Sequence, residues 1–211
     1  MKIQLEQVLP SQIEKRSFEI IEQELGDVFI PELQKPIVKR VIHTTADFDY
    51  LENLKFSEGV VEKALQALRQ GACIVTDTSM VKAGIHKATL RKLGGDVFCY
   101  MGDEDVAAEA VKRGCTRSSV CMERAVGERR PLIFAIGNAP TALIRLYELV
   151  QEGMLCPELV IGVPVGFVNV EASKELILRS GMDYIVAQGR KGGSNVAAAI
   201  CNALLYLAAG Q

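Results

Sequence analysis

The chain has 211 residues, of which 49% are hydrophobic and 24% charged, and its formal net charge is −2. Such a chain can bury a sizeable core without disulfides or metals, and its charge balance argues against nucleic acid or an acidic membrane surface as the main partner. No apolar stretch approaches the roughly 18–20 residues of a membrane span, and the first residues lack the apolar core of a signal peptide. We therefore expect a soluble, cytoplasmic protein, in which a local basic cluster can still bind an anionic small molecule.

The first 58 residues predict a helical arm. Apolar residues at helical spacing precede Gly26, and Pro36 suits the first turn of the next helix. Helices are expected at about 11–25, 36–45 and 57–70. We interpret the chain as a single domain over 1–211, with an arm over 1–58 and an α/β body over 59–211.

Short apolar runs alternate with helical segments after Gly71, a pattern typical of a mostly parallel sheet flanked by helices. About five strands are expected, at 72–77, 96–101, 132–137, 159–165 and 183–188. The intervening helices are expected at about 79–93, 104–113, 118–126, 139–151, 172–180 and 195–207. The predicted fold class is therefore α/β.

Ligands of such sheets bind beyond the carboxyl ends of the strands. The segment 189–195 follows the last predicted strand and combines three glycines with Arg190 and Lys191, so it suits a carboxylate or phosphate; a tight strand-to-helix turn explains it equally well. Asn138 suits the N-cap of the helix at 139–151. Arg117, at another helix start, could make a bidentate contact with a carboxylate.

His43 is the main candidate for proton transfer. Arg40 lies three residues before it, and Asp47 falls on the same side if the helix continues that far; the alternative is a capped helix end. Hydrolase motifs are missing, and neither the six cysteines nor the two histidines form a metal pattern, so we expect no metal and no nucleophile. The second histidine, His86, lies beside basic residues and suits a structural or solvated role.

Seven motifs along the chain resemble, in order and spacing, the precorrin-8X and cobalt-precorrin-8 methylmutases. They are Arg16-Ser17-Phe18, Val41-Ile42-His43, Thr76-Asp77 with Met80-Val81, Thr116-Arg117-Ser118, the segment 135–143, Pro164-Val165-Gly166-Phe167-Val168, and the segment 189–194. The resemblance spans nearly the whole chain.

The resemblance implies an isomerase of cobalamin biosynthesis that moves a methyl group from the α-carbon of ring C to the adjacent β-carbon. It implies that His43 donates and recovers the proton that eases this shift, without a cofactor, and that the protein is a homodimer binding the tetrapyrrole near the subunit interface. The residues taken as substrate-binding are Ser17, Arg40, Thr76, Asp77, Met80, Val81, Arg117, Ser118, Arg190 and Lys191. Arginine and lysine among them suit the carboxylates of the substrate.

The expected substrate is cobalt-precorrin-8, because Thr44-Thr45 after the histidine resemble the cobalt branch more than the metal-free one. Two alternatives are precorrin-8X, giving hydrogenobyrinic acid, and a non-catalytic corrinoid-binding protein, which would not need His43. A tetrapyrrole methyltransferase would need a glycine-rich turn after the first predicted strand, where this chain has Thr76-Asp77-Thr78-Ser79.

Overall fold

The computed structural model describes residues 6–210 and contains a six-stranded sheet of order β1-β6-β5-β4-β2-β3. All pairs are parallel except β1 with β6, which confirms the predicted α/β class with a mostly parallel sheet. The strands are β1 (Leu54–Phe56), β2 (Cys73–Thr76), β3 (Val97–Phe98), β4 (Leu132–Ile136), β5 (Leu159–Gly162) and β6 (Tyr184–Ala187).

The strand that was not predicted, β1, comes from the arm. Leu54 pairs with Ala187 and Phe56 with Ile185, so the chain enters the sheet before residue 58, where the arm was expected to end. Three residues are too few to show an alternating pattern in the sequence, and an edge strand needs only one buried face. The arm is therefore helical up to Asn53 and continuous with the sheet after it.

Helices cover both faces of the sheet. They are α1 (Ile13–Leu25), α2 (Lys35–Thr45), α3 (Tyr50–Asn53), α4 (Val60–Arg69), α5 (Ser79–Gly84), α6 (Lys87–Lys92), α7 (Glu104–Arg113), α8 (Arg117–Arg124), α9 (Pro140–Gln151), α10 (Val170–Leu178) and α11 (Ser194–Ala209), with 3-10 turns at Pro10–Gln12 and Ala125–Gly127.

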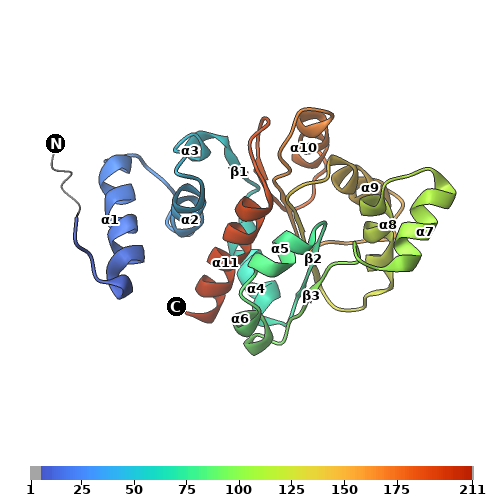
Figure 1. Ribbon diagram of the computed structural model, residues 1–211, viewed down its shortest axis with the longest axis horizontal. Coiled ribbons are helices and arrows are strands. Elements are labelled where there is room, and N and C mark those ends of the chain that lie inside the picture. Colours follow the sequence, from blue (N-terminus) through green and yellow to red (C-terminus); the bar gives the residue numbers. More distant parts are fainter. Residues whose placement is uncertain (1–5, 211) are drawn as a thin grey trace.

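Alternate residues of the parallel strands point to separate cores. Ile74 and Ile133 pack with α2, α4 and α11, whereas Val75 and Phe134 pack with α7, α8 and α9. This alternation follows from the two-residue period of a strand, and because both faces are covered the parallel strands are apolar runs, unlike the edge strand β1. Figure 1 shows α11 crossing the middle of the molecule, with α7 at the end opposite α1.

The single helix expected at 79–93 is wrong, because the chain forms α5 and α6 with a break at Ile85. Ile85 is extended and buried. The side chain of Asn202 on α11 accepts from the His86 amide at 2.8 Å and donates to the Gly84 carbonyl at 2.9 Å. These two bonds satisfy the backbone groups that the break exposes.

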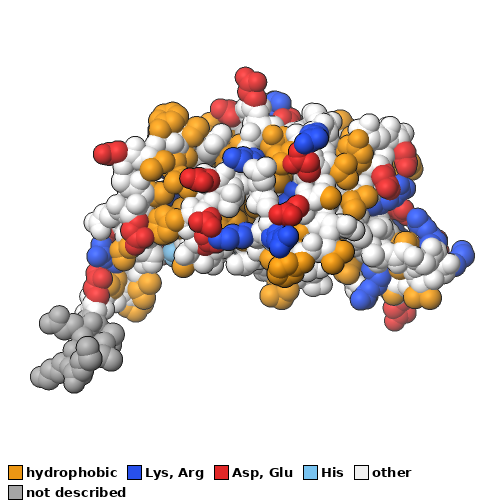
Figure 2. All heavy atoms as spheres, turned by 90° about the horizontal axis from the view of Figure 1, so that it is seen from above, with side chains coloured by type: hydrophobic (Ala, Val, Ile, Leu, Met, Phe, Trp, Pro, Cys, Tyr) orange, Lys and Arg blue, Asp and Glu red, His pale blue; other side chains and the backbone are white. Residues whose placement is uncertain are grey.

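The arm lies at one end of the molecule, where α2 packs mainly against α11 and α1 packs against α2 (Figure 1). The face in Figure 2 mixes acidic and basic side chains and shows no broad basic surface. None of the helices between residues 6 and 210 has the length and apolar character needed to cross a membrane.

Candidate active site

The His43 imidazole is exposed on the last turn of α2 and stacks on the ring of Phe18 from α1. The ring centroids are 5.0 Å apart, with 27° between the planes. Pro36 in the first turn of α2 fixes the start of this helix, and Ala46 ends it in the left-handed conformation at φ 52°. The arm therefore presents one accessible imidazole on an aromatic support.

Hollows open on both sides of His43. One, of about 400 Å³, faces α1 and is lined by Ser17, Ile20, Ile21, Glu24, Ile42, His43, Ala46 and Phe48. The other, of about 250 Å³, faces α5 and α11 and is lined by Arg40, His43, Thr44, Gly84, Asn195, Ala198, Ala199 and Asn202. The α1-side hollow is lined by apolar residues together with Ser17, Glu24 and His43, whereas the residues that line the other are mainly polar, so both polar and apolar contacts are available beside the imidazole.

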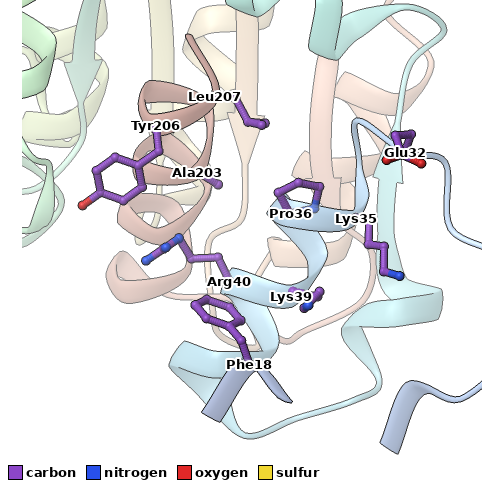
Figure 3. Close-up of a pocket in the computed structure, with 9 residues that line it drawn as sticks. All are labelled: Phe18, Glu32, Lys35, Pro36, Lys39, Arg40, Ala203, Tyr206 and Leu207. Carbon is purple, nitrogen blue, oxygen red and sulfur yellow. The ribbon is translucent and has the colours of Figure 1, made fainter. Parts of the chain in front are cut away.

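Arg40 lies one turn before His43 and its guanidinium is held between two aromatic rings. It is 5.3 Å from the Phe18 centroid and 4.9 Å from that of Tyr206 on α11, and Figure 3 shows it between them. Its Nη1 also lies 3.2 Å from a carboxylate oxygen of Glu14. Because Glu14 is 63% exposed, this pair contributes little to holding the guanidinium.

Asp47 lies beyond the end of α2 and lines neither of the hollows beside His43. The helix ends before it, and its carboxylate accepts from the Lys191 ammonium at 2.6 Å, which lowers the pKa of Asp47. Lys191 donates equally to Asp49, also at 2.6 Å. The hypothetical three-residue patch is therefore replaced by an ion pair that fastens the end of α2 to the loop after β6.

Asp77, directly after β2, caps the turn between β4 and α9. Its buried carboxylate accepts from the backbone amides of Gly137, Asn138 and Ala139 at 2.6–2.9 Å. Asn138 is thus not the N-cap that its sequence position suggested; Ala139 occupies the cap without a side-chain bond. Burial raises the pKa of Asp77, whereas the three amide bonds oppose this.

Thr76, Asp77 and Val81 are all 0% exposed, so their burial argues against direct contact with a substrate. The Thr76 hydroxyl lies 3.1 Å from the Thr78 carbonyl and 3.2 Å from that of Phe98. Met80, in contrast, is 71% exposed. Within this motif only Met80 offers surface to a ligand.

Arg117 begins α8 and its side chain is exposed, with no ion pair among residues 6–210. The adjacent Ser118 is 4% exposed, and its hydroxyl lies 2.8 Å from that of Thr141 on α9. Thr116 caps α8 and also reaches Thr141, at 2.9 Å. Ser118 therefore helps to fix the helix start from which Arg117 projects.

Hydrogen bonds connect the segments that follow β2, β5 and β6 along the carboxyl edge of the sheet. Thr78 on the β2 side reaches Ser194 at 3.1 Å, and Gly193 donates to the Val163 carbonyl at 2.8 Å. Lys191 then reaches Asp47, and this contact continues the edge to the segment that carries His43. The structure thus links the predicted motifs, although several of the side chains are buried supports.

Arg190 is the more accessible cation of the 189–194 loop. Its guanidinium lies 5.6 Å from the exposed Phe167 ring and 3.7 Å from Glu171, both solvent-facing contacts. The sequence interpretation missed the buried Lys174 beneath this loop, and also Tyr206. A lysine in a mixed helix gives no sequence signal of burial, and Tyr206 becomes part of the site only through packing of α11 on α2.

Within residues 6–210 no group of three or more His, Cys, Asp or Glu side chains could hold a metal ion. The six cysteines are all free thiols.

Comparison with known proteins identifies the family. A family model described as precorrin-8X methylmutase matches residues 12–207. The chain is 44% identical over 201 residues to a cobalt-precorrin-8 methylmutase of Priestia megaterium, covering 95% of this chain and 89% of that protein. It is 45% identical over 205 residues to that of Salmonella typhimurium strain LT2, covering 93% and 95%.

A solved structure from Thermus thermophilus, described as a precorrin-8x methyl mutase, superposes with a TM-score of 0.86 at 38% identity, covering 94% of this chain and 98% of that one. The similarity therefore includes the arm, the sheet and the loops at its carboxyl edge. The chain belongs to the precorrin-8X methylmutase family, whose members are isomerases that move a methyl group in cobalamin biosynthesis.

Proposed function

We propose that this chain is a cobalt-precorrin-8 methylmutase, which moves a methyl group from the α-carbon of ring C to the adjacent β-carbon and forms cobyrinic acid. The observation that carries the proposal is the exposed His43 imidazole, supported by Phe18 and placed between two hollows. Relatives that are 44% and 45% identical bear the cobalt-precorrin-8 name.

His43 acts in the proposal as both proton donor and proton acceptor. Its imidazolium protonates the ring-C region, the methyl group migrates within the same molecule, and the neutral imidazole takes the proton back. Atoms and charge balance without a methyl donor or an oxidant, because substrate and product are isomers. Positioned acid–base catalysis contributes roughly a hundred- to ten-thousand-fold to a rate.

The carboxylates of the substrate need cations that are free or weakly paired. Arg117 and Arg190 project from the carboxyl edge of the sheet, and Arg40 lies one turn from His43. Ser17 lines the α1-side hollow with His43. We propose these four as direct substrate contacts, with Met80 on the rim. Lys191 is occupied by Asp47 and Asp49, and its contribution is to hold the arm.

A homodimer is part of the same proposal. Several apolar side chains of the arm are exposed in the single chain: Ile13, Ile20, Val28 and Phe29. A second copy that covers them would remove apolar surface from water at the end of the molecule that carries His43. Light scattering coupled to size-exclusion chromatography checks this, and a mass near 23.0 kDa would contradict it.

The metal-free substrate precorrin-8X is the second candidate, because the similar Thermus thermophilus structure carries that name. Offering both macrocycles to the purified protein and following the corrin absorbance discriminates them. Faster turnover of the cobalt substrate supports the proposal, whereas turnover of the metal-free substrate alone would redirect it to hydrogenobyrinic acid.

The decisive variant is His43→Ala, with His86→Ala as the matched control because these are the two histidines of the chain. We expect His43→Ala to abolish conversion and to retain binding of the corrin product, and His86→Ala to keep turnover. Substantial turnover by His43→Ala would reject the proton-transfer role. Binding of product without any turnover by the wild-type protein would instead favour a non-catalytic corrinoid-binding protein.

A further inference from the structure

Lys174 is the one lysine of residues 6–210 that is fully buried. It lies on α10 with 1% of its surface exposed. Its ammonium donates to the carbonyl oxygens of Gly189 at 2.7 Å and Lys191 at 2.8 Å. A buried cation is costly unless its protons are all used, and these two partners are neutral main-chain groups of a single loop. Burial lowers the pKa of Lys174 to about 8.

The two carbonyl bonds determine how the loop after β6 runs. The carbonyls of Gly189 and Lys191 turn inward to Lys174, while the carbonyl of Arg190 between them accepts from the Gly166 amide at 3.2 Å. With these three carbonyls held on the protein side, the side chains of Arg190 and Lys191 extend outward and are exposed.

Lys191 links the loop that Lys174 anchors to the segment after His43. The Lys191 ammonium reaches both Asp47 and Asp49, which follow the end of α2. A loop that lost its inward anchor could move by an ångström or more, and this distance is enough to break the ion pairs. Lys174 thus lies at the buried end of a continuous path to the segment that presents the imidazole.

We propose that Lys174 is a positioning residue of the active site, whose ammonium anchors the loop 189–191 so that Lys191 holds the His43 segment and Arg190 stays at the mouth of the site. It touches neither the substrate nor His43 and acts through the loop. The assignment of catalysis rests on the proposed function, but the anchoring itself is measurable without turnover.

The test compares Lys174→Met with Lys63→Met by hydrogen exchange and mass spectrometry. Lys63 is a matched control, because its ammonium binds Asp183 at 2.8 Å, before the opposite end of β6. We expect exchange in 189–193 and in 46–50 to become about tenfold faster or more in Lys174→Met and to stay unchanged there in Lys63→Met. Unchanged exchange in 46–50 would overturn the proposal, since a purely structural lysine would loosen α10 alone.

A double-mutant cycle then tests the route. If Lys174 acts through Lys191, Lys174→Met with Lys191→Met should lower kcat no further than Lys174→Met alone, whereas losses that multiply would show independent roles and overturn the proposal. If Lys174→Met does not fold, Lys174→Leu, which also lacks the donor, is measured in its place with the same expectations. Lack of turnover by the wild-type protein would reject the proposed function, and exchange would still decide the anchoring.

Discussion

The ammonium of Lys191 lies 2.6 Å from the carboxylate of Asp47, and this contact joins the loop after β6 to the segment that follows His43. The two residues are far apart in sequence and belong to the body and to the arm. The contact gives Asp47 a structural role, whereas its spacing had suggested a position beside His43 only if the helix continued that far.

Lys191→Met should therefore lower kcat by roughly tenfold or more, because a displacement of about 1 Å at a reacting group can cost a hundredfold. The free energy of unfolding should change little, since exposed ion pairs contribute little. Steady-state kinetics and urea unfolding on the same preparation check both parts. Arg190→Met is the control: it should raise KM and leave exchange in 46–50 at the wild-type rate.

Asp77→Asn should destabilise the fold by about 3 kcal/mol, measured by urea unfolding. The buried carboxylate accepts three backbone bonds, and an amide places an N–H group against at least one of these donors. Asp96→Asn provides the comparison, since that part-buried carboxylate accepts one amide, from Val97 at 2.8 Å. Equal losses in the two variants would contradict the capping role.

Gly192→Ala should disrupt the loop, because a Cβ there would lie 2.2 Å from the Val163 carbonyl oxygen at a φ of +157°. Gly189→Ala is the matched variant, with φ +79° but nothing within 4 Å of its Cβ. Its cost should be about 1–2 kcal/mol from the left-handed backbone alone, and that of Gly192→Ala clearly larger. Thermal unfolding of both proteins gives the comparison, and equal costs would argue against the close approach.

Buried strands were predictable from this sequence because both faces of the sheet are covered, so 72–77 and 132–137 appear as continuous apolar runs. Strand β1 was not predictable, since in Leu54–Phe56 only Leu54 is fully buried. The break at Ile85 was equally hidden, because it is satisfied by Asn202 from the last helix. The hydrophobic pattern of a segment predicts its structure where burial of that segment alone determines it. The pattern cannot show a hydrogen-bond partner that lies more than a hundred residues away.

The same limit applies to the site. His43 could be identified as a candidate because few side chains exchange protons near neutral pH and this chain has two histidines. The end of α2 was predictable too, since the helix expected at 36–45 ends at Thr45 in the structure. The partner of Asp47 was not predictable, because Lys191 lies 144 residues further along the chain and was interpreted only as an anion-binding residue.

Lys174 also predicts how stability depends on pH. Burial lowers its pKa from 10.5 to about 8 in the folded protein, so between these values the unfolded chain holds a proton that the folded protein has released. Because the unfolded state binds more protons, the free energy of unfolding rises with pH across this window. The stability gained from deprotonation of Lys174 is fully present above the unfolded pKa of 10.5 and is lost as the pH falls to about 8. Between about pH 8 and pH 9.5 it should amount to about 2 kcal/mol.

Urea unfolding of wild type and Lys174→Met at several pH values isolates this contribution, because tyrosines, cysteines and the other lysines titrate in both proteins and cancel in the difference. The free energy of unfolding of the wild type minus that of the variant should increase as the pH rises from about 8. Curves that stay parallel would mean that Lys174 keeps an ordinary pKa. In that case the carbonyl bonds of Gly189 and Lys191, at 2.7 and 2.8 Å, would stabilise the ammonium enough to offset the cost of its burial.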